Sequence, residues 1–323
     1  MKLAAIDIGS NSLKLVVVEA TAGDSFAVIA SEREVVRLGQ ETLVNRHIGE
    51  AATRRAIDCL KRFRAVAETH GAERIAAIAT ASVREANNAD EFIRTVEQET
   101  GLRIEVLSGI EEARLIGLAA SQGCTEKSDG HNNTAVTSLN IDIGGGSTEI
   151  SIFRDGEPLN LVSIKLGAVG LTDRFIRSDP PARDELDQLR TEIRSVLQTV
   201  ASDLLVQRWH YTTATSGTAV TIGAVLNNSS TITLADLKRL NAKLASLTIA
   251  ERRTIMHFAP QRADIIVAGA LVLEETMNAL AIESLRVCDW SLREGVIIDR
   301  LRSAQRSSES VARVTGEKID SVR

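Results

Sequence analysis

Two short segments of the chain each place an aspartate before glycine and hydroxyl side chains. Residues 7–12 read DIGSNS and residues 142–147 read DIGGGS. When residues 7–17 and 142–152 are aligned without gaps, the aspartate, the isoleucine, the first glycine and the serine at the sixth position are identical. Each segment follows an apolar run and leads into another, which predicts two equivalent turns between strands. Coincidence between two hairpins is the weaker explanation.

The residue types of these turns suit phosphate binding. Glycine permits positive φ and close backbone approach, and successive N–H groups in such a turn form a nest for anions. An aspartate at a strand end can hold a hydrated Mg²⁺ ion, which prefers carboxylate, water and phosphate oxygens. Each turn alone could be an ordinary hairpin, but two facing turns would clamp a phosphate. The residues concerned are Asp7, Gly9, Ser10, Ser12, Asp142, Gly144, Gly145, Gly146, Ser147 and Thr148.

A third segment, residues 108–114 (SGIEEAR), predicts a helix that starts with a carboxylate on its apolar face. Ser108 and Glu111 have the spacing of a capping box, which gives Glu111 a structural task. Glu112 has apolar residues three, four and seven positions after it, so it lies on the apolar stripe of the helix. A buried carboxylate is costly. Glu112 is therefore either paired with an arginine such as Arg84 or acts as a general base facing a cleft.

Weaker signals lie elsewhere in the chain. Residues 80–87 (TASVREAN) follow a predicted strand, and Arg84 could contact a phosphate or form a surface ion pair. Another predicted strand is followed by a turn of small residues with hydrogen-bond donors, Ser216, Gly217 and Thr218. Arg262 precedes a long apolar helix. These four residues are further candidates for ligand contact. The P-loop and the dinucleotide-binding glycine pattern are both absent from the sequence.

These residues must be positioned by alternating strands and helices, which predicts an α/β fold. In the first half, strands are expected at residues 2–7, 12–20, 25–37, 75–80 and 103–107, and helices at 49–71, 90–100 and 110–122. In the second half, strands are expected at residues 138–143, 148–154, 157–166, 211–215 and 285–288, and helices at 170–177, 183–205, 264–280 and 293–302.

The turn-rich stretch at residues 123–138 predicts a junction between domains. We therefore expect an N-terminal domain at residues 1–123 and a C-terminal domain at residues 138–302, whose last helix could pack back on the first domain. Residues 303–323 are polar without a clear period and are predicted to form a mobile tail.

Composition limits the class of protein. The 323 residues are 44% hydrophobic but only 3% aromatic, with a net charge of −5, which argues against a base-stacking nucleic-acid binder. No apolar run is long enough to span a membrane. Three cysteines lie far apart in the sequence, which suggests a reducing compartment. A cytoplasmic protein that binds neither nucleic acid nor membrane is expected.

Taken together, the motifs resemble those of the exopolyphosphatase/guanosine pentaphosphate phosphohydrolase (Ppx/GppA) family. The segments DIGSNS, TASVREAN, SGIEEAR, DIGGGSTE, TSGT, RAD and LREG stand in the family's order from about residue 3 to residue 300. The family belongs to the actin/sugar-kinase/heat-shock ATPase superfamily. The resemblance implies two actin-like (ribonuclease H-like) domains, each a mixed five-stranded sheet with flanking helices, and an active site in the interdomain cleft. It also implies a homodimer.

The resemblance further implies a role for each matching position. Glu112 would activate the attacking water, and Asp7 and Asp142 would assist Mg²⁺ and water. Phosphate binding would involve Ser10, Asn11, Ser12, Arg84, Gly144, Gly145, Gly146, Ser147 and Glu149.

The expected activity is Mg²⁺-dependent removal of the terminal phosphate from inorganic polyphosphate. The alternatives are guanosine pentaphosphate as substrate, a phosphotransferase or ATPase of the superfamily, and a non-catalytic nucleotide sensor. The chain lacks the His-Asp dipeptide of longer family members, so it resembles the short, two-domain form. Ser291 stands where the family often has glycine before LREG.

Overall fold

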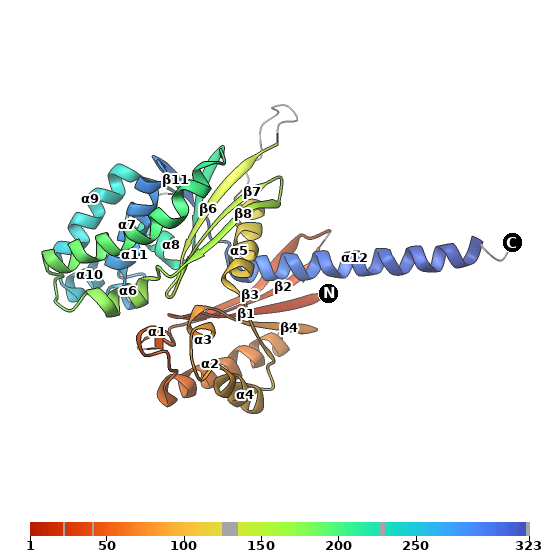
Figure 1. Ribbon diagram of the computed structural model, residues 1–323. Coiled ribbons are helices and arrows are strands. Elements are labelled where there is room, and N and C mark those ends of the chain that lie inside the picture. The colour runs from red at the N-terminus through yellow and green to blue at the C-terminus, as the bar shows by residue number, and fades with distance from the viewer. Residues whose placement is uncertain (22, 41, 125–134, 227–229, 321–323) are drawn as a thin grey trace.

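A computed structural model describes residues 1–320, except 22, 41, 125–134 and 227–229, and describes residues 307–320 by their backbone alone (Figure 1). It contains two sheets. The first has the strand order β3-β2-β1-β4-β5. Its strands are β1 (Lys2–Ile8), β2 (Leu13–Ala20), β3 (Phe26–Glu34), β4 (Arg74–Ala79) and β5 (Ile104–Val106). The first three strands are antiparallel neighbours, and β4 and β5 run parallel to β1.

The second sheet repeats this topology and adds one strand. Its order is β10-β11-β9-β6-β7-β8. Its strands are β6 (Thr137–Ile143), β7 (Thr148–Arg154), β8 (Glu157–Ile164), β9 (Tyr211–Thr215), β10 (Thr231–Thr233) and β11 (Ser284–Val287). Strands β8, β7, β6, β9 and β11 correspond to β3, β2, β1, β4 and β5, with the same directions. The predicted fold class is confirmed, and the short edge strand β10 makes the second sheet six-stranded rather than five-stranded.

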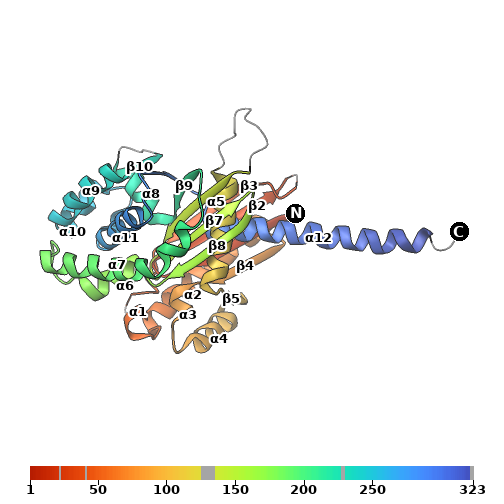
Figure 2. The same cartoon turned by 45° about the horizontal axis from the view of Figure 1, so that its top comes forward.

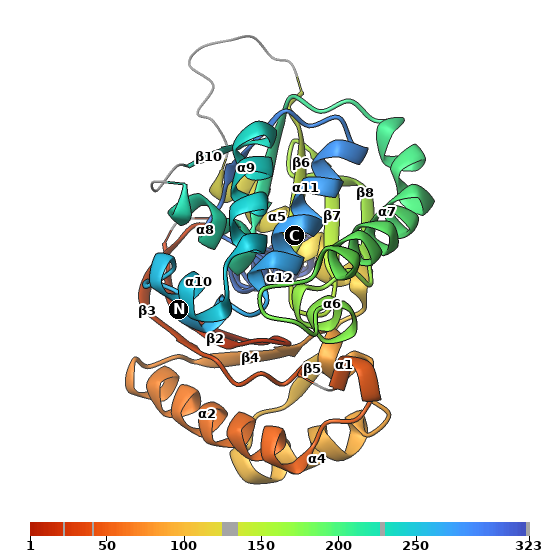
Figure 3. The ribbon, with the colours of Figure 1, turned by 90° about the vertical axis from the view of Figure 1, so that its left-hand side faces the viewer.

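The helices of the first half cover both faces of its sheet. They are α1 (Thr42–Asn45), α2 (Glu50–Thr69), α3 (Ala81–Arg84), α4 (Ala89–Thr100) and α5 (Gly109–Gly123). Because strand side chains alternate between faces, Ala4, Ile6 and Ile8 pack against α2, while Leu3 and Ala5 pack in a separate core with α5 and α12. Helix α5 also packs against β7 and β8, so α5 lies between the two sheets (Figures 1 and 3).

The second half carries most of the remaining helices on the far face of its sheet (Figure 3). They are α6 (Ala168–Phe175), α7 (Arg183–Leu205), α8 (Ser216–Val225), α9 (Leu234–Ser246), α10 (Ile249–Ile255), the 3₁₀ turn Pro260–Arg262 and α11 (Ile266–Ala279). Helices α9 and α10 were not expected from the sequence. Residues 216–218, which were expected to form a turn, begin α8.

The last helix differs from its predicted extent. Helix α12 (Leu292–Asp320) crosses back onto β1, β2 and α5. The residues predicted to form a polar tail are helical as far as Asp320, because α12 continues past residue 302 and extends away from the rest of the molecule (Figures 1 and 2). This stretch contains no proline, so its backbone can stay helical without an apolar stripe. The domain boundaries themselves remain a prediction, and most of the expected linker lies outside the described residues.

The interpretation of the cysteines is corrected by the fold. Cys124, directly after α5, and Cys288, directly after β11, form a disulfide although 164 positions separate them in the sequence. Cys59 is free and buried in the first core. The cysteine spacing therefore no longer supports a reducing compartment. None of the described helices combines the length and apolar character that crossing a bilayer requires.

Candidate active site

The two glycine turns connect equivalent hairpins, β1–β2 and β6–β7. They lie against each other across the two halves of the molecule. A Cβ atom at Gly145 would stand 2.8 Å from Cβ of Ser10, and a Cβ at Gly146 would stand 3.0 Å from Oγ of Ser10. These separations are shorter than normal contacts, so a larger residue at either glycine would push the turns apart. The predicted pairing of the turns is confirmed.

The expected positive φ at these glycines is wrong. Positive φ occurs at four described glycines, none of them in either turn. The glycines of the second turn are needed for close approach instead. A Cβ at Gly144 would stand 3.2 Å from the backbone oxygen of Ser147, and one at Gly146 would stand 2.7 Å from Cβ of Ala81.

One cleft brings most of the predicted residues together. Both turns, the start of α5 and the start of α8 line it, with Lys14, Thr80 and Leu292 as additional neighbours. A larger groove between the first sheet and α12 holds none of the predicted residues. The predicted residues that line the cleft are Asp7, Gly9, Ser10, Asn11, Ser12, Glu112, Asp142, Gly144, Gly145, Gly146, Ser147, Ser216, Gly217 and Arg262.

Glu112 is paired with Arg84 and also lines the cleft. The residue is 6% exposed, and its Oε2 accepts a hydrogen bond of 2.9 Å from Nη1 of Arg84. Burial raises the pKa of Glu112 to about 7, although Arg84 lowers it, and the charges of Asp7 and Asp142 raise it further. A carboxylate whose pKa lies near neutrality is suited to taking a proton from water. The ion pair therefore does not exclude a catalytic role.

Asp142 is held by hydroxyl groups on one side of its carboxylate. Its Oδ2 accepts hydrogen bonds from Oγ1 of Thr215 at 2.6 Å and from Oγ of Ser291 at 2.9 Å. Complete burial raises its pKa despite these bonds and the nearby charge of Lys14. Asp7 faces Lys14 across the hairpin, and Nζ of Lys14 lies 3.4 Å from its Oδ2.

Glu149 occupies the position in the second hairpin that Lys14 occupies in the first. Its Oε1 accepts a hydrogen bond of 2.8 Å from Oγ of Ser163. Burial raises the pKa of Glu149 well above its ordinary value, and the charges of Glu112 and Asp142 add to this effect. Three buried carboxylates thus gather beside the second turn. Lys14 was not expected at the site, although it aligns with Glu149 in the internal repeat, and Ser291 was noted only as a departure from the family's usual glycine.

The donor set fits a hydrated Mg²⁺ ion. Among the described residues, no cluster of three or more histidine, cysteine or acidic side chains forms a complete metal site. Mg²⁺ usually keeps several waters and takes only one or two protein carboxylates plus substrate phosphate. Asp7 and Asp142 would supply such a pair. Burial and, to a smaller extent, the charge of Asp7 raise the pKa of Asp142, and a bound cation would offset that charge.

Two buried donors lack partners within the described part of the chain. Nδ2 of Asn11 and Nε of Arg262 have no hydrogen-bond acceptor among the described residues, and both residues line the cleft. Burial lowers the pKa of Arg262 to about 9, with the charge of Arg33 adding to the effect. Unpaired buried donors are costly, and phosphate oxygens are acceptors that would pair them. Their position agrees with an anionic ligand.

The other predicted residues have different surroundings. Oγ of Ser216 and Oγ1 of Thr218 both donate to the backbone oxygen of Ile143, at 2.8 and 3.0 Å. Thr218 is buried and does not line the cleft. These hydroxyl groups therefore tie α8 to the end of β6, a structural contact. Arg84 reaches the site through Glu112 rather than by lining the cleft itself.

The fold and the cleft define a protein of the actin-like class, with two equivalent α/β halves whose first hairpins face one another. The chain belongs to the Ppx/GppA phosphatase family, whose sequence profile matches residues 16–304. This agrees with the resemblance found in its motifs.

Individual relatives match over nearly the whole chain. The protein is 32% identical over 334 residues to exopolyphosphatase 1 of Mycobacterium leprae, covering 99% of this chain and 96% of that protein. It is 33% identical over 320 residues to exopolyphosphatase 1 of Mycobacterium tuberculosis, covering 94% and 89%.

Solved structures agree. A crystal structure of an exopolyphosphatase from Cytophaga hutchinsonii superposes with a TM-score of 0.85 at 27% identity, covering 94% of this chain and 98% of that chain. The Aquifex aeolicus Ppx/GppA family member superposes with a TM-score of 0.77 at 26% identity, with the same coverage.

Proposed function

We propose that this protein is an exopolyphosphatase, which hydrolyses the terminal phosphoanhydride bond of inorganic polyphosphate with Mg²⁺. The observation that carries the proposal is the position of Glu112, a buried carboxylate with a pKa of about 7 that lines a cleft between two glycine turns. A protein that only bound phosphate would have no use for a costly buried base. The names of the Mycobacterium relatives support polyphosphate as the substrate class.

In the proposed mechanism, backbone N–H groups of the second turn bind the terminal phosphate, and the first turn closes on it from the other half. Glu112 accepts a proton from a water molecule, and the water oxygen attacks phosphorus in line. The P–O bond to the next phosphate breaks, which releases orthophosphate and a chain shorter by one unit. Asp7 and Asp142 would hold Mg²⁺, which supplies charge neutralisation on the phosphate oxygens. General-base action of this type contributes about 10²–10⁴-fold.

The test is a phosphate-release assay with four substrates: short polyphosphate, long polyphosphate, guanosine pentaphosphate and ATP. Glu111→Gln is a matched control, because Glu111 is the neighbouring residue and pairs with Arg114 outside the cleft. We expect release from polyphosphate in the wild type and in Glu111→Gln, with a loss of at least about 100-fold in Glu112→Gln. No release from any substrate would refute the proposal. Release from guanosine pentaphosphate alone or from ATP alone would favour the alternative substrate or a phosphotransferase.

Three finer features belong to the same proposal. Mg²⁺ is proposed as the metal, and removal by a chelator should abolish release until Mg²⁺ is restored. A homodimer is proposed because the family resemblance implies one, and sedimentation would measure it. The cytoplasmic location expected from the composition of the chain is also a proposal, and cell fractionation would test it.

A further inference from the structure

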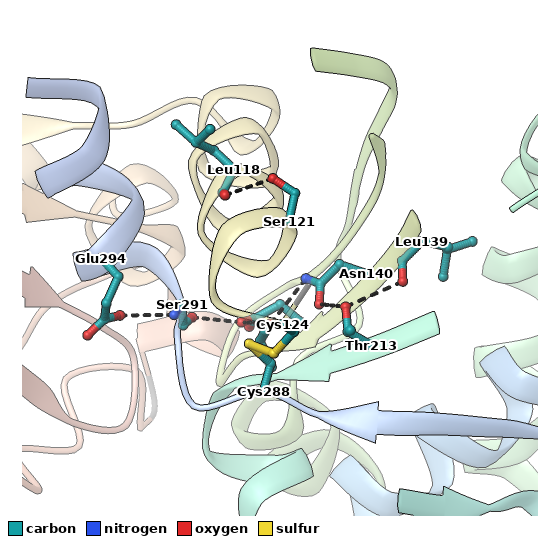
Figure 4. The surroundings of a disulfide bond; sticks show 11 residues. Leu118, Ser121, Cys124, Leu139, Asn140, Thr213, Cys288, Ser291 and Glu294 are labelled. Carbon is teal, nitrogen blue, oxygen red and sulfur yellow. Dashed lines mark hydrogen bonds between the residues drawn. A yellow bond between two sulfur atoms is a disulfide. The ribbon is translucent and has the colours of Figure 1, made fainter. Parts of the chain in front are cut away.

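The connection between β11 and α12 reaches into the cleft. This connection, residues 288–291, joins the second sheet to the helix that packs on the first sheet. Its last residue, Ser291, donates from Oγ to Oδ2 of Asp142 at 2.9 Å. The backbone N–H of Ser291 donates to Oε2 of Glu294 at 2.9 Å (Figure 4). Ser291 is therefore fixed at its backbone while its hydroxyl group holds the aspartate.

A chain of polar groups holds the same carboxylate oxygen from inside the second half. Oγ1 of Thr213 donates to Oδ1 of Asn140 at 2.8 Å, and Nδ2 of Asn140 donates to Oγ1 of Thr215 at 3.2 Å. Oγ1 of Thr215 then donates to Oδ2 of Asp142. With two hydroxyl groups on Oδ2, the other oxygen of Asp142 is left for the cleft. The orientation of Asp142 therefore depends on Thr215 in the second sheet and on Ser291 in the connection.

The disulfide fixes the other end of this connection. Cys288 bonds to Cys124, with 6.1 Å between their Cα atoms (Figure 4). Cys124 directly follows α5, whose first turn carries Glu112. The bond therefore links the helix of the proposed general base to the segment that carries Ser291. Next to it, the ring of Trp290 stacks on Phe26 with 5.1 Å between centroids.

We propose that Ser291 is a positioning residue for Asp142, and that the Cys124–Cys288 disulfide keeps Ser291 in place relative to the helix of Glu112. Turnover then falls when the disulfide is reduced. The inference rests on the proposed function, because Asp142 matters to turnover only if the cleft hydrolyses phosphate.

Reduction would follow ordinary thiol–disulfide exchange with a dithiol reagent. A thiolate of the reagent attacks the sulfur of Cys124, which is the more exposed of the pair, and Cys288 leaves as a thiolate and takes up a proton. The second thiol of the reagent then closes its own disulfide and releases Cys124 as a thiol. Two electrons pass to the protein, which gains two thiols, and the reagent is oxidised.

The first experiment tests the hydroxyl group. Ser291→Ala should lower kcat for polyphosphate about tenfold, the effect of losing a charge-assisted hydrogen bond. KM should change less than about twofold, because the hydroxyl group of Ser291 donates to Asp142. Ser291→Thr, which keeps the hydroxyl group, should recover most of the lost kcat. Wild-type kcat in Ser291→Ala would overturn the positioning role, and so would an equal loss in Ser291→Thr.

The second experiment tests the disulfide with dithiothreitol. Thiol titration should find two additional thiols after reduction, and kcat should fall about tenfold, as in Ser291→Ala. Cys288→Ser should show this lower kcat before reduction and no further loss after it. Cys59→Ala is the matched control, because it removes the free thiol and should keep full sensitivity to the reagent. Unchanged kcat in the reduced wild type would overturn the proposal.

A readout other than turnover separates this inference from the proposed function. Trp290 lies between Cys288 and Ser291, and Trp209 is the other tryptophan. In a Trp209→Phe background, reduction should shift the wavelength of the Trp290 emission maximum as the connection moves, whereas loss of quenching by the disulfide alone changes the intensity. An unchanged emission maximum would overturn the role of the disulfide even in a chain that shows no phosphate release. If the oxidised wild type releases no phosphate but shows the emission change on reduction, the proposed function is refuted and the structural role of the disulfide stands.

Discussion

Replacing Glu112 by glutamine should make the protein more stable and less active at the same time. The pKa of Glu112 is raised from the ordinary 4.5 to about 7. A carboxyl group whose pKa is higher in the folded chain than in the unfolded chain favours its protonated form on folding. Ionising it therefore costs stability, and this cost grows as the pH rises from 4.5 to about 7 and is constant above that.

The size of this cost follows from the two pKa values. At about 1.4 kcal/mol for each pKa unit, it is about 3 kcal/mol at pH values above about 7. Glutamine has nearly the same shape as the neutral acid and cannot ionise. The free energy of unfolding of Glu112→Gln should therefore be about 3 kcal/mol larger than that of the wild type at about pH 8. At about pH 5 the difference should be less than about 1 kcal/mol.

The measurement is equilibrium urea unfolding of both proteins at the two pH values, in a chelator so that no divalent cation pairs with the carboxylates. The phosphate-release assay is run on the same preparations with Mg²⁺ restored. Glu111→Gln, one residue away and outside the cleft, serves as the control and should show neither effect. The reasoning is refuted if Glu112→Gln is less stable than the wild type at both pH values. That result would mean that the ion pair with Arg84 is a net stabilising contact.

Three further predictions concern the same region. kcat/KM should fall as the pH drops below about 7, because Glu112 must be ionised to act as the base. In Arg84→Met this fall should occur at higher pH, since Arg84 lowers the pKa of Glu112. Gly146→Ala should separate the two turns and cost about 1–3 kcal/mol in urea unfolding, with reduced phosphate release. Gly295→Ala should cost at least as much, because its Cβ would overlap the backbone of α5. A Cβ at Gly49 would have no atom of the described residues within 4 Å, so Gly49→Ala should be neutral in packing.

Much of the fold could be predicted from the sequence because it is encoded locally. Strands, turns and the helix of Glu112 follow from apolar periodicity, and the internal repeat predicted two equivalent halves before any contact was known. Two helical stretches were not predicted, because neither has a strong apolar period in the sequence. Residues 216–218 begin a helix rather than form a turn, and the tail is helical.

The sequence by itself determined the two aspartate-glycine turns, the apolar face that buries Glu112 and the family to which they belong, since these features depend on residues within a few positions of each other. Only the tertiary structure decided that Ser291 meets Asp142 and that Cys124 meets Cys288, across 149 and 164 positions of sequence. The physical reason is the packing of α12 across β1, β2 and α5. That packing brings the β11–α12 connection to the cleft and to the end of α5, an outcome that no local pattern specifies.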